Sequence, residues 1–218
     1  MSASASPFRI EVPGEALDDL AERLRRTRFG APSDERSWAA GADPGYLREL
    51  VASWATFDWR TQEAALNERP HFIAEIDGRR LHYVHVRAVG APADRPALPL
   101  ILSHGWPSSF VEMLPLADRL SDPARFGGDP AEAFDVVIPS LPGFLFSDPL
   151  PGPATRVGFA RVLHALMTEV LGYRSYGAFG GDIGGATSAW LGALNPDKVV
   201  GVHLIHPPFP GSFDSPPT

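Results

Sequence analysis

The chain has 218 residues, of which 44% are hydrophobic, and it contains no cysteine. This length allows one domain with a sizeable core, or a domain with an appendage, whereas the lack of cysteine excludes a disulfide framework, a thiol nucleophile and a thiolate metal site. The formal net charge of −7 argues against nucleic acid as the main partner, because phosphate binding needs clustered Lys and Arg.

The sequence contains no apolar stretch that approaches the roughly 20 residues of a membrane-spanning helix. Residues 1–6 are small and polar, without the charged start and apolar core of a signal peptide. We therefore expect a cytoplasmic protein that does not insert into a membrane.

The first part of the chain is predicted to be helical. Leu17, Leu20 and Leu24 have helical spacing and Pro13 suits the start of a helix, which predicts a helix over residues 13–28. The only basic cluster of the sequence lies at the end of this helix: Arg23, Arg25, Arg26 and Arg28. Basic side chains suit the carboxyl end of a helix dipole, so we interpret the cluster as a solvated face.

A turn-rich connector over residues 30–45 leads to two further predicted helices, over residues 44–55 and 59–67. A β-hairpin is expected after them. Apolar and polar residues alternate over residues 72–76, Asp77-Gly78 suits a two-residue turn, and the apolar residues resume at Leu81.

Strands alternate with helices in the second part of the chain. The expected strands lie near residues 98–103, 134–138, 175–180 and 199–205, and the expected helices near residues 108–120, 156–172 and 183–195. This alternation predicts a parallel sheet of βαβ units, and the short, continuous apolar strands fit a sheet that is covered on both faces.

An acidic residue surrounded by glycines lies where a predicted strand gives way to a helix: Gly180-Gly181-Asp182-Ile183-Gly184-Gly185. A strand, a sharp turn and a helix form a nucleophile elbow, which needs small residues because the two backbones come close together. The carboxylate of Asp182 can attack an electrophilic carbon and leave an ester on the enzyme. The alternative is that Asp182 only caps the helix that begins at Ile183.

A second segment fits such a site. The apolar strand over residues 98–103 runs into His104-Gly105-Trp106-Pro107. Transfer sites on this fold need a backbone N–H from the loop after an earlier strand, which completes an oxyanion hole with the residue after the nucleophile. Trp106 and Ile183 are then the two N–H donors. The Trp106-Pro107 peptide bond is a candidate for the cis form, which X–Pro bonds tolerate.

Together, these stretches resemble the epoxide hydrolases of the α/β-hydrolase superfamily, in the branch typified by microsomal epoxide hydrolase. The motifs that match are HGWP at residues 104–107, PSLPGFLFSD at 139–148 and GGDIG at 180–184. Their agreement in order and spacing is specific, whereas a single G-x-D-x-G would be weak. The region before His104 is similar to the N-terminal extension of that branch at residues 8–10, 17–20, 23–24, 57–60, 63, 66–67, 76–78 and 82.

The resemblance implies the N-terminal half of an α/β-hydrolase fold, with a mostly parallel sheet and flanking helices. Residues 1–95 would form an epoxide hydrolase N-terminal extension, made of helices and a hairpin that joins the core sheet. Residues 96–218 would form the first part of the core.

The resemblance also implies roles for site residues. Asp182 would be the nucleophile, with the backbone N–H groups of Trp106 and Ile183 as oxyanion-hole donors. Supporting positions would be His104, Gly105, Pro107, Gly180, Gly181, Gly184 and Gly185. A small hydrophobic epoxide would react with water to give a vicinal diol, without a metal or cofactor.

Two positions depart from the family pattern: Ser108 stands where the family commonly has Gly, and Ile183 where it often has Trp. Neither change removes a backbone donor. Members of the branch run to nearly twice this length and continue with a cap that supplies two tyrosines and with strands that supply an acid and a histidine. No residue of this chain matches those positions, so the chain looks C-terminally truncated and is expected to complete at most half of the reaction.

The histidines are weaker candidates for chemistry. We interpret His104 as a brace of the oxyanion loop, and His82 and His85 as structural residues of the hairpin. His206 falls at the carboxyl end of the last predicted strand, where ligands bind in open α/β sheets. A metal site made by His203 and His206 is disfavoured, because residues three apart on a strand point to opposite faces.

Three functional hypotheses follow. The first is an epoxide hydrolase, of which this chain is the N-terminal half. The second is a haloalkane dehalogenase, which also uses an elbow aspartate, although those enzymes usually place a halide-binding Trp where this chain has Ile183. The third is a non-catalytic fragment or a binding module.

Overall fold

The computed structural model describes residues 4–30, 38–39, 41–92 and 94–205. Contacts between residues divide the chain into two compact units. The larger unit comprises Met1–Arg9 and Arg69–Thr218, and the smaller one comprises Ile10–Glu68.

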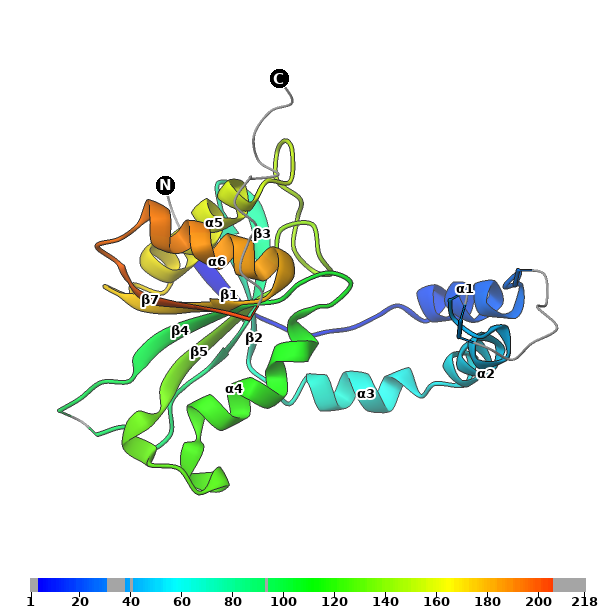
Figure 1. The fold of residues 1–218 in the computed structure, drawn as a ribbon, viewed down its shortest axis with the longest axis horizontal. Coiled ribbons are helices and arrows are strands. Elements are labelled where there is room, and N and C mark those ends of the chain that lie inside the picture. Colours follow the sequence, from blue (N-terminus) through cyan, green and yellow to red (C-terminus); the bar gives the residue numbers. More distant parts are fainter. Residues whose placement is uncertain (1–3, 31–37, 40, 93, 206–218) are drawn as a thin grey trace. The chain divides into compact units, whose positions relative to one another are not determined.

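The larger unit is built on a mixed seven-stranded sheet with the order β1-β2-β3-β5-β4-β6-β7 (Figure 1). Its strands are β1 (Ser4–Phe8), β2 (His71–Ile76), β3 (Arg79–Val86), β4 (Leu98–Ser103), β5 (Phe134–Pro139), β6 (Tyr176–Gly180) and β7 (Val199–Leu204). The pairs from β1 to β5 are antiparallel, and the pairs that join β5, β4, β6 and β7 are parallel. The four parallel strands are those that the sequence predicts.

The predicted hairpin is confirmed and joins the core sheet through β3, which pairs with β5. Its turn residues Asp77 and Gly78 have φ angles of 51° and 71°. Positive φ at both central residues is the pattern of a two-residue turn whose twist matches that of the strands. The first expected arm, 72–76, is one residue longer at its start, because His71 pairs with Val84.

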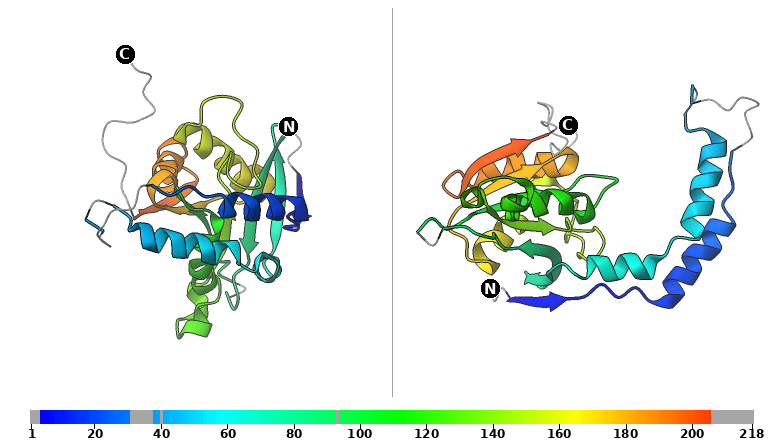
Figure 2. Two further views of the ribbon diagram at one scale, coloured as in Figure 1. Left: turned by 90° about the vertical axis from the view of Figure 1, so that its right-hand side faces the viewer. Right: turned by 90° about the horizontal axis from the view of Figure 1, so that it is seen from below.

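Helices cover both faces of the sheet. The short 3₁₀ helix η1 (Phe110–Met113) leads into α4 (Leu114–Ser121) on one face, while α5 (Arg156–Ala165) and α6 (Asp182–Leu194) pack together on the other (Figures 1 and 2). Fully buried side chains fill the layers: Tyr83, Ile101, Leu163, Leu166, Met167, Tyr176 and Leu191. Cover on both faces explains why the parallel strands show continuous apolar runs instead of alternation.

Some elements differ from the sequence prediction. The edge strand β1 (Ser4–Phe8) was not predicted, because it has few large apolar residues and contains Pro7. Proline has no backbone N–H to donate. An edge strand tolerates it where the proline nitrogen faces away from the neighbouring strand. The helix expected near 156–172 is α5 followed by the π-helical turn η4 (Leu166–Val170). The loop between α4 and β5 contains two unpredicted 3₁₀ turns, η2 (Pro123–Phe126) and η3 (Pro130–Glu132).

The smaller unit contains α1 (Gly14–Arg25), α2 (Pro44–Ala55) and α3 (Trp59–Leu66). The α1 helix packs against α2. Asp43 and Asp58 cap α2 and α3, since their carboxylates accept hydrogen bonds from the N–H groups of Tyr46 and Thr61. The predicted helix over 13–28 is shorter at both ends.

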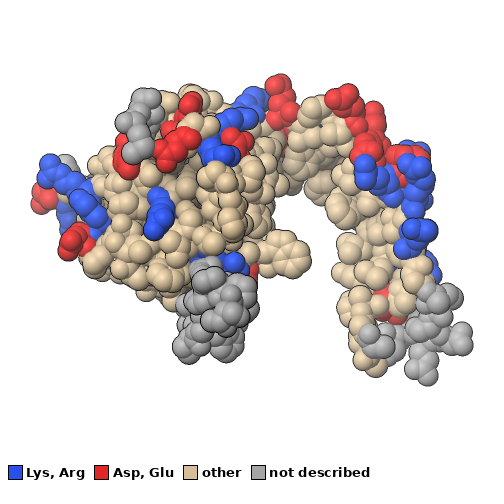
Figure 3. Space-filling view, turned by 90° about the horizontal axis from the view of Figure 1, so that it is seen from above, with Lys and Arg blue, Asp and Glu red and all other residues tan. Residues whose placement is uncertain are grey.

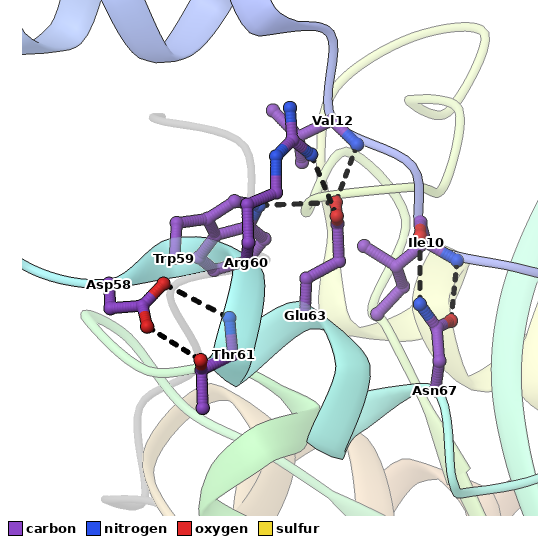
Figure 4. A network of polar contacts seen from close by, with 8 residues as sticks. All are labelled: Ile10, Val12, Asp58, Trp59, Arg60, Thr61, Glu63 and Asn67. Carbon is purple, nitrogen blue, oxygen red and sulfur yellow. Dashed lines mark hydrogen bonds and ion pairs between the residues drawn. The ribbon is translucent and has the colours of Figure 1, made fainter.

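Glu63 of α3 and Asn67, which follows the helix, bind the extended segment that precedes α1 (Figure 4). The amide of Asn67 accepts from the N–H of Ile10 and donates to its carbonyl, both at 2.8 Å. The carboxylate of Glu63 accepts from the N–H of Val12 at 2.7 Å and from Arg60 at 2.7 Å. The side chains of Asn67 and Glu63 thus form the hydrogen bonds that a neighbouring strand would otherwise form with this extended backbone.

The arginines at the end of α1 are paired with carboxylates of the same helix. Arg23 contacts Asp19 at 2.6 Å, while Arg25 and Arg26 contact Glu22 at 2.9 and 3.0 Å. Acidic and basic side chains accordingly lie next to one another on the surface drawn in Figure 3. This arrangement fits the interpretation of the cluster as a solvated face.

Candidate active site

The site begins where two neighbouring parallel strands end together. Ser103, the last residue of β4, lies opposite Gly180, the last residue of β6. The residues that follow, His104-Gly105-Trp106 and Gly181-Asp182, therefore leave the sheet side by side. This place is the carboxyl edge of the parallel strands, where open α/β sheets bind ligands.

Asp182 occupies the sharp turn between β6 and α6. Its φ angle is 51°, in the left-handed region that costs a residue with a side chain about 1–2 kcal/mol. The helix begins at Asp182 itself and Gly181 precedes it in an extended conformation. A φ of 51° lies outside the right-handed helical range, so Asp182 lies in the turn at which α6 begins.

The glycines of the elbow leave room for backbone contacts. A Cβ atom at Gly184 would lie 2.1 Å from the carbonyl oxygen of Ser103. A Cβ atom at Gly180 would lie 2.4 Å from the carbonyl carbon and oxygen of Gly184. Both contacts are far inside van der Waals distance, so only glycine lets β6, α6 and the end of β4 approach this closely.

The loop after β4 brings a backbone donor to the elbow. The N–H of Trp106 donates to Oδ2 of Asp182 at 2.8 Å. Gly105 permits the approach, because a Cβ atom there would lie 2.9 Å from Cβ of Asp182 and 3.0 Å from Oδ2. The Trp106-Pro107 peptide bond is cis, as expected, and the Trp106 side chain is 68% exposed.

Ile183 follows as the second residue of α6, and its side chain packs against the hydrophobic core. Ile183 can therefore contribute only its backbone N–H to the site. Gly185, which follows Gly184, is buried and donates its own N–H to the carbonyl of Gly181 at 2.9 Å within the first helical turn.

His104 joins two loops, as the sequence interpretation of a brace predicts. Its Nε2 accepts from the N–H of Leu141 at 3.1 Å, so its Nδ1 carries the proton and donates to the carbonyl of Gly105 at 2.9 Å. The ring is fully buried, and burial lowers the pKa of His104. A neutral imidazole thus ties the loop after β5 to the loop that carries the Trp106 donor.

A buried polar network behind this loop was not predicted. Nδ1 of His82 contacts Oγ of Ser140 at 2.9 Å, and Nε2 contacts Nδ1 of His71 at 2.9 Å. Ser147 closes the network, because its hydroxyl accepts from the N–H of His82 at 3.0 Å and donates to the carbonyl of Ser140 at 2.7 Å. Burial, with the neighbouring His71, lowers the pKa of His82 to about 3.

A second polar cluster lies at the other end of β5. The hydroxyl of Tyr173 donates to Asp135 at 2.9 Å and contacts Nε2 of His85 at 2.9 Å, while Arg87 contacts Asp135 at 2.8 Å. Burial lowers the pKa of His85 to about 4. Asp135 starts β5, so this cluster is remote from the carboxyl edge, and the structural interpretation of His82 and His85 fits their contacts.

The remaining histidine candidates are not brought into the site. His203 lies on β7, where its ring contacts that of Phe179 at 5.3 Å between centroids. His206 lies outside the described residues. Among the residues that the structure describes, no group of three or more His, Asp or Glu side chains could hold a metal ion. No helix within the same residues is long and apolar enough to cross a membrane.

Comparisons with known families agree with this geometry. The model named epoxide hydrolase N terminus matches residues 5–113, and the model named α/β hydrolase fold matches residues 99–217. The chain belongs to both families. Together the two matches cover nearly all of this α/β-hydrolase chain, including the elbow and the loop after β4.

The chain is similar to epoxide hydrolases in sequence and structure. Epoxide hydrolase 1 of Sus scrofa is 34% identical over 207 residues, which are 92% of this chain and 44% of that protein. The structure of Aspergillus niger epoxide hydrolase has a TM-score of 0.78 and 32% identity, over 97% of this chain and 55% of that one. Juvenile hormone epoxide hydrolase from Bombyx mori has a TM-score of 0.81 and 27% identity, over 94% and 48%. The chain thus spans about half the length of the relatives that it matches.

Proposed function

We propose that this chain is the nucleophile-bearing half of an epoxide hydrolase, and that Asp182 forms an ester with an epoxide carbon. The contact of 2.8 Å between the Trp106 N–H and Oδ2 of Asp182 carries the proposal. It places a backbone donor on one carboxylate oxygen, where charge on a tetrahedral intermediate would develop.

The two carboxylate oxygens then have different tasks. Oδ2 is held by Trp106, so Oδ1 attacks the less hindered epoxide carbon. The carbon–oxygen bond of the ring breaks, the ring oxygen takes up a proton from water, and a hydroxyalkyl ester remains with Oδ2 as its carbonyl oxygen. When water attacks the ester carbon, the negative charge forms on Oδ2, next to the N–H groups of Trp106 and Ile183.

The second step needs a general base that activates water. By resemblance, the acid and histidine of this step come from the half of the relatives that the chain does not match. Loss of a general base commonly slows a reaction ~10²–10⁴-fold. We therefore expect the ester to accumulate on the isolated chain.

The substrate class in this proposal is a small hydrophobic epoxide, with water as the second reactant. The match to the epoxide hydrolase N terminus favours it over a haloalkane dehalogenase. A cytoplasmic location is part of the same proposal.

Intact-mass spectrometry after incubation with styrene oxide tests the proposal. We expect the wild type to gain the mass of one styrene oxide, and Asp182→Asn to gain nothing. Asp197→Asn, a change at an exposed aspartate, is the matched control and should still form the adduct. An unmodified but folded wild type, or an adduct on Asp182→Asn, would contradict the proposal and favour a non-catalytic fragment or binding module.

A further inference from the structure

The peptide group that carries the Trp106 donor is held from its other side. The carbonyl of Gly105 and the N–H of Trp106 belong to one trans peptide plane and point in opposite directions. Nδ1 of His104 donates to this carbonyl at 2.9 Å, and the N–H of Ser108 donates to it at 3.3 Å. Because the plane is rigid, the groups that fix the carbonyl also fix the direction in which the N–H points at Asp182.

His104 is fixed in turn by the loop that follows β5. Its Nε2 accepts from the N–H of Leu141 at 3.1 Å, and its ring lies edge-on to that of Phe144, with 4.9 Å between the centroids. The ring of His104 is fully buried. Its position, and with it the direction of the Nδ1–H bond, therefore depends on where the backbone of Leu141 is held.

The backbone next to Leu141 is held by His82 of β3. Ser140 donates its N–H to the carbonyl of His82 at 2.9 Å, and its hydroxyl contacts Nδ1 of the same histidine at 2.9 Å. At the other end of the loop, the Ser147 hydroxyl accepts from the N–H of His82 at 3.0 Å and donates to the carbonyl of Ser140 at 2.7 Å. Both ends of the loop over residues 140–147 are thus bonded to one residue of a neighbouring strand.

The ring of His82 also contacts the segments that follow β4 and β5. Between ring centroids, Phe110 at the start of η1 lies at 5.0 Å and Phe146 at 5.2 Å. Nε2 of His82 contacts Nδ1 of His71 on β2 at 2.9 Å. Ser140 and His82 are both fully buried. Water does not compete for a buried hydrogen bond, so this contact fixes the loop more firmly than an exposed one would.

We propose that His82 and Ser140 are positioning residues for the backbone donor that binds Asp182. Their contact sets the backbone at Leu141, which sets the ring of His104. That ring sets the peptide group whose N–H binds Oδ2 of Asp182. The expected effect on rate rests on the proposed function, whereas the direction of the N–H is a property of the unreacted chain.

A role in folding alone predicts a different result. A buried contact that only supports folding would lower the free energy of unfolding without altering the N–H of Trp106. The matched control is His85, which is also a buried histidine of β3 but contacts Tyr173, away from the carboxyl edge. His85→Asn removes this contact, because the shorter amide does not reach the position of Nε2.

Three variants test the contact between His82 and Ser140. Ser140→Ala removes the hydroxyl. His82→Gln has an amide that reaches the position of Nε2, so it keeps the contact with His71 but loses the one with Ser140. His82→Asn has an amide near the position of Nδ1, keeps the contact with Ser140 and is the expected rescue. Circular dichroism checks that each variant is folded.

NMR of the full 218-residue chain follows the amide proton of Trp106. An N–H that donates to a carboxylate resonates downfield of one that does not. We therefore expect this resonance to move upfield in Ser140→Ala and His82→Gln, and to stay near its wild-type position in His82→Asn and His85→Asn. An unchanged resonance in Ser140→Ala and His82→Gln, or an equal movement in His85→Asn, would overturn the proposal.

Ester formation with saturating styrene oxide is the second measurement, followed by intact-mass spectrometry. A displacement of ~1 Å can slow a reaction about a hundredfold, so we expect Ser140→Ala and His82→Gln to react about tenfold more slowly or worse. The concentration of styrene oxide that gives half the maximal rate should not change. Equal rates in all variants would overturn the positioning role. If the wild type forms no ester but the Trp106 resonance moves as expected, the proposed function is wrong and the positioning role is supported.

Discussion

Gly184 and Ser103 approach so closely that a Cβ atom on Gly184 would lie 2.1 Å from the Ser103 carbonyl oxygen. Both partners are backbone, so neither can rotate away. Overpacking of a dense core costs about 1–3 kcal/mol even where side chains can adjust. We therefore expect Gly184→Ala to lower the free energy of unfolding by about 3 kcal/mol or more, measured by urea denaturation.

The matched control for this change is Gly181→Ala. Its added Cβ would have only Ile205 nearby, at 3.8 Å, and its φ of −126° suits any residue. The control should change the stability by less than about 1 kcal/mol. If both variants lost the same free energy of unfolding, the close approach to β4 would not be the reason that position 184 needs glycine.

Acid should destabilise the protein through His82. Burial lowers its pKa from 6.5 to about 3 in the folded state, whereas the unfolded chain binds a proton near pH 6.5. The unfolded state therefore binds more protons between these values. Above pH 6.5, His82 does not lower the free energy of unfolding. Below it, the free energy of unfolding falls as the pH drops towards 3, by up to about 1.4 kcal/mol per pH unit for one such histidine. His85, whose pKa is lowered to about 4, acts in the same direction.

Urea unfolding from pH 7 to pH 4 measures this effect. In His82→Asn, an amide can still contact Ser140 but no longer takes up a proton, so we expect lower stability at pH 7 and a shallower loss on acidification. A change at exposed His203, His203→Asn, serves as control and should keep the wild-type slope. If His82→Asn also kept that slope, His82 would not be the source of the acid sensitivity.

The hydroxyl of Tyr173 should matter more than that of Tyr176. The first contacts Asp135, His85 and Arg87, whereas within the described part of the chain the second contacts only His164, at 3.0 Å. Tyr173→Phe leaves the partly buried carboxylate of Asp135 with one donor fewer, and loss of such a hydrogen bond costs about 1 kcal/mol or more. The pKa of Asp135, held low in part by this hydroxyl despite burial, should rise.

Urea denaturation of Tyr173→Phe and Tyr176→Phe compares the two losses directly, since the same atom is removed in each. Carboxyl titration by NMR follows Asp135 in both variants. A larger loss for Tyr176→Phe, or an unchanged Asp135 titration in Tyr173→Phe, would contradict the prediction.

The sequence predicted those features that depend on local chemistry. Asp77-Gly78 identified the hairpin turn because both residues accept positive φ, and the glycines around Asp182 identified a place where backbones meet. The contact of His82 with Ser140 was missed, since it joins residues 58 positions apart and no local pattern records it. The edge strand β1 was missed because backbone pairing with β2, not side-chain burial, holds it in place. The division of the chain at residues 95–96 stays a prediction.

The last prediction concerns the contacts between α3 and the segment before α1 (Figure 4). Asn67→Asp keeps an acceptor for the Ile10 N–H but replaces the donor to the Ile10 carbonyl with a carboxylate oxygen. Repulsion of the two oxygens should open this contact, at a cost of about 1–3 kcal/mol. Because 1.4 kcal/mol corresponds to a factor of ten, we expect the amides of Ile10 and Val12 to exchange hydrogen about tenfold faster or more.

Hydrogen exchange followed by mass spectrometry measures this opening. Asn195→Asp removes a comparable amide donor, which binds the Leu191 carbonyl at 3.1 Å at the end of α6. Since that bond lies in the other compact unit, the control should leave exchange at Ile10 and Val12 unchanged while it loosens the end of α6. Unaltered exchange at Ile10 in Asn67→Asp would show that Glu63, through its bond to the Val12 N–H, holds the segment without help from Asn67.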